Sequence, residues 1–142
     1  MQDDQQQKKG QFFHFDPFVY DVDAALRIIR DEPRPDRLQE IDVAVWARSL
    51  GLHKSQEEIR RGNTIPLFIP KDFNEEYART QADLSVPLIF ADLSKEGDEP
   101  GYMLIDGTHR LRRAVIEGVE KLPVYLLDRA EALRIREVKF YR

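Results

Sequence analysis

The sequence predicts an α+β domain (a mixed α/β fold) in which a small mixed sheet carries flanking helices. Two observations predict it. Short apolar runs that end at turn residues are interleaved with segments of helical period, most clearly from residue 86 onward. The chain has 142 residues, and 42% of them are hydrophobic, which is enough for one compact core. Strands and helices do not alternate as a regular βαβ series, and this favours a mixed sheet.

The N-terminal quarter predicts one helix between irregular segments. The stretch from Phe12 to Tyr20 is aromatic and interrupted by Pro17, which is typical of a strand or an extended segment. Residues 21–30 have apolar side chains at helical spacing and predict a helix. Two prolines within residues 31–37 end that helix in a loop.

Residues 38–45 have apolar side chains at alternate positions. This pattern favours a short strand that leads into a helix ending at Gly51. The same residues also fit an earlier helix start, with Asp42 as the N-cap.

Three short elements are expected next. Ser55 and Glu58 form a capping-box pattern, which predicts a helix over residues 55–61. Residues 65–70 are apolar but contain two prolines, so they predict at most an edge strand. Residues 74–81 predict a short helix.

The C-terminal part has the clearest pattern. It predicts, in order, a strand at 86–93, a polar turn, a strand at 101–105, a helix at 108–118, a strand at 122–127, a helix from Asp128 to about Arg136 and a strand at 138–141.

Composition excludes several classes of protein. The sequence has no cysteine, which excludes a disulfide framework, a thiolate metal site and a cysteine nucleophile. Its three histidines are too few and too scattered to predict a metal cluster. No apolar run approaches the roughly 18–20 residues of a membrane span. Residues 1–11 are polar apart from Met1 and glycine, which predicts a disordered tail before a single domain over residues 12–142. We therefore expect a cytoplasmic protein with no membrane partner.

The clearest functional pattern is a strand, a glycine turn and a helix. An apolar strand ends at Asp106, Gly107 turns without a Cβ, and a helix begins at Thr108. A helix N-terminus offers backbone N–H groups and the positive end of the helix dipole, so it binds phosphate readily. His109 and Arg110 add positive side chains there, against the dipole, at a cost of about 0.3–1 kcal/mol each. The pattern predicts a site in which an anion supplies the missing negative charge.

A purely structural interpretation fits the same residues. Asp106 is then only an N-cap, and His109 and Arg110 form a solvated face paired with Glu117 or Asp128. Turns of this kind are common, so the pattern alone leaves both interpretations open.

The segment resembles the ParB/sulfiredoxin superfamily. The residues that carry the resemblance are Asp106-Gly-Thr-His-Arg-Leu-Arg-Arg-Ala114, then Glu117-Gly118, then Leu122-Pro-Val-Tyr-Leu-Leu127. In that superfamily a strand, a D-G-x-[HR]-R turn, a helix that ends near glycine and an x-P-V strand occur in this order. The resemblance covers residues 86–127 and implies a compact ParB/sulfiredoxin-like, nucleotide-binding domain.

Members of this superfamily use the turn to hold phosphates of CTP in ParB, and of ATP in sulfiredoxin and related free serine kinases. The resemblance implies that Gly107 and Thr108 offer backbone N–H groups to phosphate. It also implies that His109, Arg110 and Arg112 contact phosphate oxygens, with ATP or CTP and Mg²⁺ as the cofactor.

Carboxylates are the second part of what the resemblance implies. Asp106 matches a catalytic or magnesium-organising carboxylate of the kinases, and His109 is the second catalytic candidate. The run Glu40-Ile-Asp42 before a helix is similar to the upstream element, so Glu40 and Asp42 are candidates for a second carboxylate.

The departures from the superfamily exclude two of its activities. Sulfiredoxin has its nucleophilic cysteine where Thr108 stands, so sulfinic acid reduction is excluded. ParB carries a G-E-R-R-x-R-A run, of which Arg110 and Arg112 are kept. Only fifteen residues follow Leu127, so we expect neither a helix-turn-helix domain nor centromere binding.

The first functional expectation is a small NTP-dependent phosphotransferase or NTPase. The alternatives are a non-catalytic nucleotide- or partner-binding module of a plasmid or phage system, with no particular protein partner indicated, and a ParB-like nuclease. Residues 100–142 carry nine Lys/Arg against six Asp/Glu, but residues 1–99 carry thirteen against twenty. The formal net charge of −4 therefore predicts weak binding of duplex DNA, whereas a mononucleotide needs only the one turn.

Overall fold

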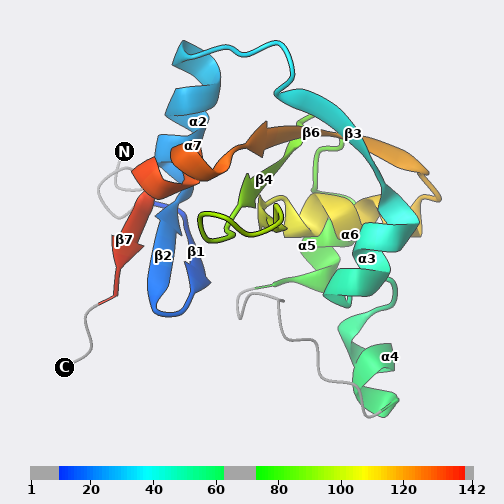
Figure 1. Cartoon of the computed structure of the whole chain (residues 1–142). Helices are drawn as coiled ribbons and strands as arrows, with labels where there is room; N and C mark the ends of the chain where they lie inside the picture. The colour runs from blue at the N-terminus through cyan, green and yellow to red at the C-terminus, as the bar shows by residue number, and fades with distance from the viewer. Residues whose placement is uncertain (1–9, 63–72, 140–142) are drawn as a thin grey trace, which may run out of the picture. The chain divides into compact units, whose positions relative to one another are not determined.

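The computed structural model describes residues 10–62 and 73–139, which form six helices and seven strands in two sheets (Figure 1). The predicted α+β class is therefore confirmed. None of the described helices is both long and apolar enough to cross a lipid bilayer. The predicted edge strand at 65–70 and most of the predicted tail, residues 1–9, lie outside the described residues.

The first sheet is antiparallel and has the strand order β1 (Phe12–Phe15), β2 (Phe18–Asp21), β7 (Arg136–Val138). β1 and β2 form a hairpin whose turn contains Pro17, which explains the interruption of the aromatic stretch. β7 begins earlier than the strand predicted at 138–141, because the preceding helix already ends at Arg134; residues 140 and 141 of that prediction lie outside the described residues.

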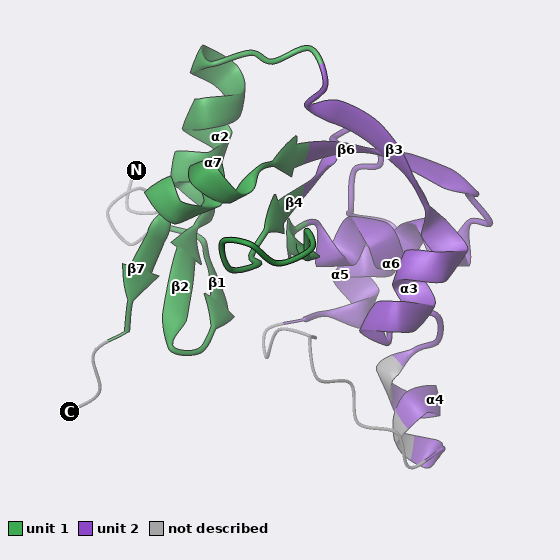
Figure 2. Cartoon of the chain, in the orientation of Figure 1, with its two compact units in different colours: residues 1–35, 90–106, 126–142 green, residues 36–89, 107–125 purple. Residues whose placement is uncertain are grey.

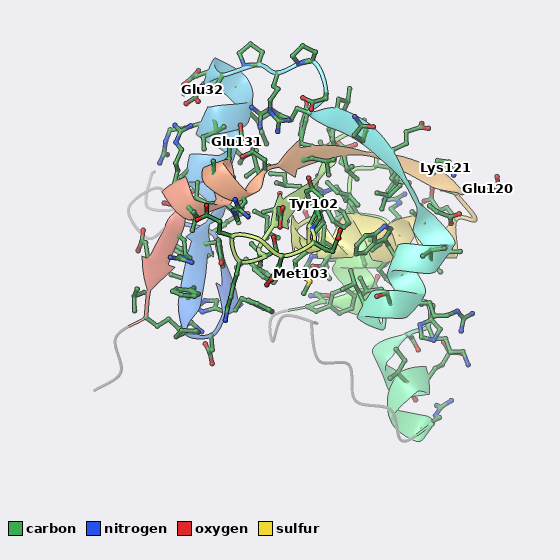
Figure 3. The ribbon with its side chains drawn as sticks, viewed as in Figure 1. Glu32, Tyr102, Met103, Glu120, Lys121 and Glu131 are labelled. Carbon is green, nitrogen blue, oxygen red and sulfur yellow. The ribbon has the colours of Figure 1, made fainter. Side chains whose placement is uncertain are left out.

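The second sheet has the order β3 (Leu38–Asp42), β6 (Lys121–Leu127), β4 (Leu88–Asp92), β5 (Tyr102–Asp106). β3 runs antiparallel to β6 with Asp42 opposite Lys121, which Figure 3 labels at the start of β6. All five residues of β4 are buried, as an inner strand requires. The sequence predicts one sheet, and the structure corrects this to two, because β1, β2 and β7 pair with one another.

The chain divides into two compact units (Figure 2). Unit 1 takes its residues from 1–35, 90–106 and 126–142, and unit 2 takes its residues from 36–89 and 107–125. The prediction of a single domain over residues 12–142 stays a prediction. At the end of the predicted tail, the Gln11 carbonyl accepts a hydrogen bond from Val22 N–H at 2.9 Å.

Unit 1 contains helices α2 (Val22–Asp31) and α7 (Arg129–Arg134). The Asp21 side chain caps α2, and Asp128 with Glu131 forms a capping box at the start of α7. Arg134 of α7 pairs with Glu32 after α2 at 2.7 Å; Figure 3 labels Glu32. The buried apolar residues of unit 1 include Tyr20, Val22, Ala25, Ile28, Phe90, Ala91, Leu104, Ile105, Leu127, Ala132 and Ile135.

In unit 2, helix α3 (Val43–Leu50) begins directly after β3. The favoured prediction of a strand through residue 45 is wrong, and the alternative with Asp42 as N-cap is correct. The Asp42 carboxylate accepts a hydrogen bond from Val45 N–H at 3.4 Å. Val43 is buried and Val45 is exposed, so these two valines lie on different sides of a helix.

Unit 2 also contains α4 (Gln56–Arg61), α5 (Glu75–Thr80) and α6 (Thr108–Ile116). The predicted capping box of Ser55 and Glu58 is confirmed, because each side chain accepts a hydrogen bond from the other residue's N–H. The Asn74 side chain caps α5. Helix α6 packs against both α3 and α5 (Figure 1). The buried apolar residues of unit 2 include Val43, Ala47, Leu52, Ala78, Leu88, Leu111, Ala114 and Val124.

Candidate functional site

A glycine begins helix α6. Gly107 has φ 118° and ψ 19°, a conformation that glycine adopts far more easily than other residues. A Cβ at Gly107 would lie 2.4 Å from Leu88 Cδ2 and 3.4 Å from Leu88 Cα, so the close packing on β4 also requires glycine. Asp106, the last residue of β5, is half-buried. The turn predicted from the sequence is therefore present, but Gly107 and not Asp106 occupies the N-cap position.

The N-terminus of α6 differs from those of the other described helices. Each of the other five begins with a side-chain cap, supplied by Asp21, Asp42, Ser55, Asn74 or Asp128. Gly107 supplies none, and the first turn of α6 contains no acidic residue. Among the described helices, α6 is thus the one whose N-cap residue has no side chain to cap the helix. No oxygen of that residue's side chain faces the positive end of the helix dipole.

His109, in the first turn of α6, is held by the start of α5. Its Nε2 accepts a hydrogen bond from Asn74 N–H at 2.9 Å. Its ring stacks on Phe73 with a centroid distance of 4.9 Å and an interplanar angle of 6°, and Tyr77 meets it edge-on at 5.1 Å. Because a backbone N–H can only donate, Nε2 carries no proton in this arrangement, and the imidazole is neutral with its proton on Nδ1.

Arg110 lies against the segment that leads into β4. Its Nη1 donates hydrogen bonds to the carbonyl oxygens of Val86 at 3.0 Å and Pro87 at 2.6 Å. The side chain therefore fixes the first turn of α6 beside the strand that Gly107 also contacts. Its predicted contact with phosphate stays a prediction.

Arg112 is buried, at 7% exposure. Its Nε lies 2.9 Å from Glu75 Oε2 in α5, and its Nη1 donates to the Leu52 carbonyl at 3.2 Å. These contacts join α6 to α5 and to the segment after α3. The structure thus gives Arg112 a position inside unit 2, one turn along α6 from the first residues of the helix.

The purely structural interpretation names two acids, Glu117 and Asp128, and the structure shows what each of them contacts. Glu117 pairs with Arg113 at 2.6 Å, and Asp128 caps α7. Both acids thus have other partners in the structure, and their pairing with His109 or Arg110 stays a prediction.

Glu40 and Asp42, the candidates for a second carboxylate, lie on the same face of β3, since residues two apart in a strand share a face. Glu40 is exposed and lies opposite Pro123 in register. Asp42 is exposed and serves as the N-cap of α3. Within residues 10–62 and 73–139, no group of three or more His, Cys, Asp or Glu side chains is placed to hold a metal ion.

Sequence reasoning missed the aromatic surroundings of His109 and a polar cluster near Arg112. In that cluster, Nδ1 of His53 and Oε1 of Glu75 are buried and make no hydrogen bond. Burial, followed by the positive charges of Arg48, Lys54 and Arg112, lowers the pKa of His53 below its ordinary value. His53 is therefore neutral at physiological pH. The sequence predicts the helix that begins near residue 74, but no local feature indicates that the first residues of this helix contact His109.

No family model, curated protein or solved structure matches this chain.

Proposed function

We propose that this protein binds a nucleoside triphosphate at the first turn of α6 and acts as a small NTP-dependent phosphotransferase or NTPase. The observation that carries the proposal is the start of this nine-residue helix: a tightly packed glycine in the N-cap position, no side-chain cap and no acidic residue in the first turn. A phosphate group supplies the negative charge and the hydrogen-bond acceptors that such a helix end lacks.

The first turn divides into groups with different roles. The backbone N–H groups of Gly107 and Thr108 offer hydrogen bonds to phosphate oxygens. Arg110 contributes positive charge while its bonds to two carbonyls hold it in place. His109 is neutral in the described arrangement, so it offers an Nδ1–H donor rather than a positive charge. Arg112 holds α6 against α5 through its ion pair with Glu75.

ATP or CTP with Mg²⁺ is the cofactor that the resemblance to the ParB/sulfiredoxin superfamily implies. Mg²⁺ is usually held by one or two carboxylates together with the phosphates themselves, so a preformed protein cage is not required. Asp106 is the carboxylate next to the turn, and it is half-buried at the end of β5. We assign it the role of magnesium organiser or general base.

The test uses a substitution with opposite effects on stability and on binding. Thr108→Glu adds an acid to the first turn of α6, which stabilises the helix by about 0.3–1 kcal/mol but repels phosphate. Thermal shifts with ATP, CTP, ADP and GTP, with and without Mg²⁺, are expected in the wild type and absent in the variant. Ligand at about 100 times its Kd adds about 2.7 kcal/mol, a readily measured shift.

Ala44→Glu is the matched control, because Ala44 is exposed in the first turn of α3, which also lacks an acid. It adds the same charge to a different helix and is expected to leave the nucleotide shifts intact. Nucleotide shifts of equal size in Thr108→Glu and the wild type would refute the site.

A non-catalytic nucleotide-binding module, as part of a plasmid or phage system, is the second candidate. The observation that favours it is the arrangement of His109, whose Nε2 and ring faces are already engaged by Asn74, Phe73 and Tyr77. A wild type that binds nucleotide but consumes none over hours supports this candidate.

The nuclease alternative is tested by duplex DNA. Each neutralised phosphate adds about 0.9 to the salt slope of binding, and the turn region offers few cations for a long polyanion. We expect weak binding at physiological salt in an anisotropy titration. Tight duplex binding with a steep salt dependence would place the nuclease first.

A further inference from the structure

Helices α4, α5 and α7 have six residues each, and helices this short depend on the hydrogen bonds at their ends. In α4 and α7 a glutamate accepts the backbone N–H of the N-cap residue. Glu58 bonds to Ser55 N–H at 3.0 Å, and Glu131 bonds to Asp128 N–H at 2.9 Å. Each glutamate lies three residues after the cap and belongs to the same helix, as in a capping box.

Helix α5 has no such glutamate. Its N-cap is Asn74, and the residue three positions later is Tyr77, which has no carboxylate. The side-chain oxygen of Asn74 accepts from Tyr77 N–H at 2.9 Å, and its carbonyl accepts from Ala78 N–H at 3.0 Å. Its own N–H donates to Nε2 of His109 at 2.9 Å. A histidine of α6, which packs against α5 in unit 2 (Figure 1), therefore completes the cap.

An imidazole and a carboxylate stop accepting hydrogen bonds at different pH values. A glutamate ordinarily gains a proton near about pH 4.3, and a histidine near about pH 6.5. A proton on Nε2 of His109 makes that nitrogen a donor, which cannot bond to the N–H of Asn74. Rotation of the ring does not restore the bond, because both nitrogens of a protonated imidazole are donors.

We propose that His109 is a pH-sensitive cap of α5. In its neutral form the imidazole accepts the N–H of Asn74 and holds the first turn of α5 on α6. In its protonated form it releases Asn74. The cap belongs to the unliganded chain and does not depend on the proposed nucleotide binding.

The release is confined to the first turn, because α5 has a second attachment to α6. Glu75, the next residue, pairs with Arg112 at 2.9 Å. Glu76 of α5 pairs with Arg79 of the same helix. Acidic and arginine side chains ordinarily keep one charge between about pH 5 and 8, so these pairs persist while a histidine titrates.

The remaining charged groups near His109 along the chain are Asp106, three residues before it, and two arginines of α6. Arg110 donates to the carbonyl oxygens of residues 86 and 87, and Arg113 donates to that of residue 82. Tyr77, whose ring meets the imidazole edge-on at 5.1 Å, ordinarily titrates only near about pH 10. The imidazole is thus the group of this contact that changes charge close to neutral pH.

The first test uses the wild-type chain without nucleotide, so it does not depend on any variant folding. Nitrogen-15 NMR follows the imidazole of His109 from about pH 8 to about pH 5, the range in which histidines titrate. Amide exchange, corrected for its intrinsic dependence on pH, follows Asn74 N–H over the same range. Its protection is expected to fall about tenfold, with the midpoint of the imidazole, because one hydrogen bond is lost.

Asp128 N–H is the internal control, because its acceptor is the carboxylate of Glu131. Its protection is expected to stay constant over this range. Constant protection of Asn74 while His109 titrates, or an equal fall at Asp128, overturns the proposal. It is also overturned if His109 stays neutral down to the pH at which the chain unfolds.

Two variants change the acceptor. His109→Gln supplies an amide oxygen that does not titrate, and it is expected to remove the pH dependence at Asn74. Tyr77→Glu places a glutamate three residues after the cap, as in α4 and α7. It is expected to move the loss of protection from near about pH 6.5 to near about pH 4.3.

His53→Gln is the matched control. His53 is the other histidine of unit 2, and it follows Leu52, whose carbonyl accepts from Arg112. This variant is expected to keep the wild-type pH dependence at Asn74. A pH dependence that survives in His109→Gln and disappears in His53→Gln would assign the effect to His53 and overturn the proposal.

Discussion

Arg112 of α6 and Glu75 of α5 form an ion pair whose two partners are buried to different extents. The side chain of Arg112 is 8% exposed and that of Glu75 is 33% exposed, with Nε and Oε2 2.9 Å apart. Arg112 has one further acceptor, the Leu52 carbonyl. The side chain of Glu75 is the more exposed of the two, although its Oε1 is buried, so the guanidinium depends on the carboxylate more than the carboxylate depends on the guanidinium.

Glu75→Ala is expected to destabilise the fold more than Arg112→Met. The first variant leaves a charge buried without its carboxylate, which costs about 1–3 kcal/mol. The second replaces the guanidinium by an apolar side chain of similar length while Glu75 turns to water. Urea unfolding measures both. Glu76→Ala is the control, because Glu76 is also acidic and in the first turn of α5 but is exposed. A greater loss in Arg112→Met would contradict the asymmetry.

His109 is expected to be neutral at neutral pH, with its proton on Nδ1. The reason is the Asn74 N–H, which requires an unprotonated Nε2. Nitrogen-15 NMR of the imidazole distinguishes the two tautomers, and His109→Phe assigns the signal while it retains an aromatic ring beside Phe73 and Tyr77. A protonated Nε2 in the wild type would show that the Asn74 contact is not formed.

Asp92 is expected to make stability depend on pH in the acid range. Burial raises its pKa, but hydrogen bonds from Ser94 and Gly101 and the charge of Arg129 outweigh burial, so the pKa lies below its ordinary value. Because the folded-state pKa is lowered, the stabilisation is fully present above the unfolded value of about 3.9 and is lost as pH falls through the folded pKa.

The carboxylate oxygen of Asp92 accepts hydrogen bonds from Ser94 N–H, Ser94 Oγ–H and Gly101 N–H at 2.9, 2.6 and 3.1 Å. Asp92→Ala is therefore expected to lose about 1.5 kcal/mol or more at neutral pH. Asp92→Asn keeps an acceptor oxygen and is expected to flatten the acid part of the stability profile. Urea unfolding at several pH values checks both, and an unchanged profile in Asp92→Asn would assign the pH dependence to another group.

Asp106→Asn separates catalysis from binding. Gly107 is the N-cap of α6, so the substitution leaves the helix start intact, and the protein is expected to stay folded. An enzyme would lose turnover by orders of magnitude while nucleotide binding persists or tightens, because a repelling carboxylate is gone. Phosphate release and thermal shift measure the two properties. Unchanged turnover would remove Asp106 from the chemistry.

Local signals in the sequence predict most elements of this fold. The caps at Ser55, Asn74 and Asp128 act within one turn of helix, so they are readable without knowledge of the rest of the chain. The border at Asp42 was ambiguous because three valine and isoleucine positions fit both an alternating and a helical pattern. Pairing of β2 with β7 was beyond sequence reasoning, since no local feature links the two segments.

Part of the candidate site could likewise be predicted from the sequence, and part could not. The turn at Gly107 was predicted, because a strand, a glycine and a helix follow one another directly in the sequence. The partners of the basic side chains were not. Arg110 bonds to carbonyls before β4, and Arg112 is buried against Glu75, but a positive charge in a sequence does not reveal which distant acceptor it meets.

The pairing of β2 with β7 has a consequence for the nascent chain. Lys139 and Asp16, which bond next to this sheet, are 123 residues apart in the sequence. A lone two-stranded hairpin is marginal in water, and contacts between distant residues form late because the intervening chain must first be ordered. The aromatic hairpin of β1 and β2 therefore leaves the ribosome long before β7 and is secured only after β7 has followed it. During that interval its phenylalanines are the surface that a chaperone is best placed to shield.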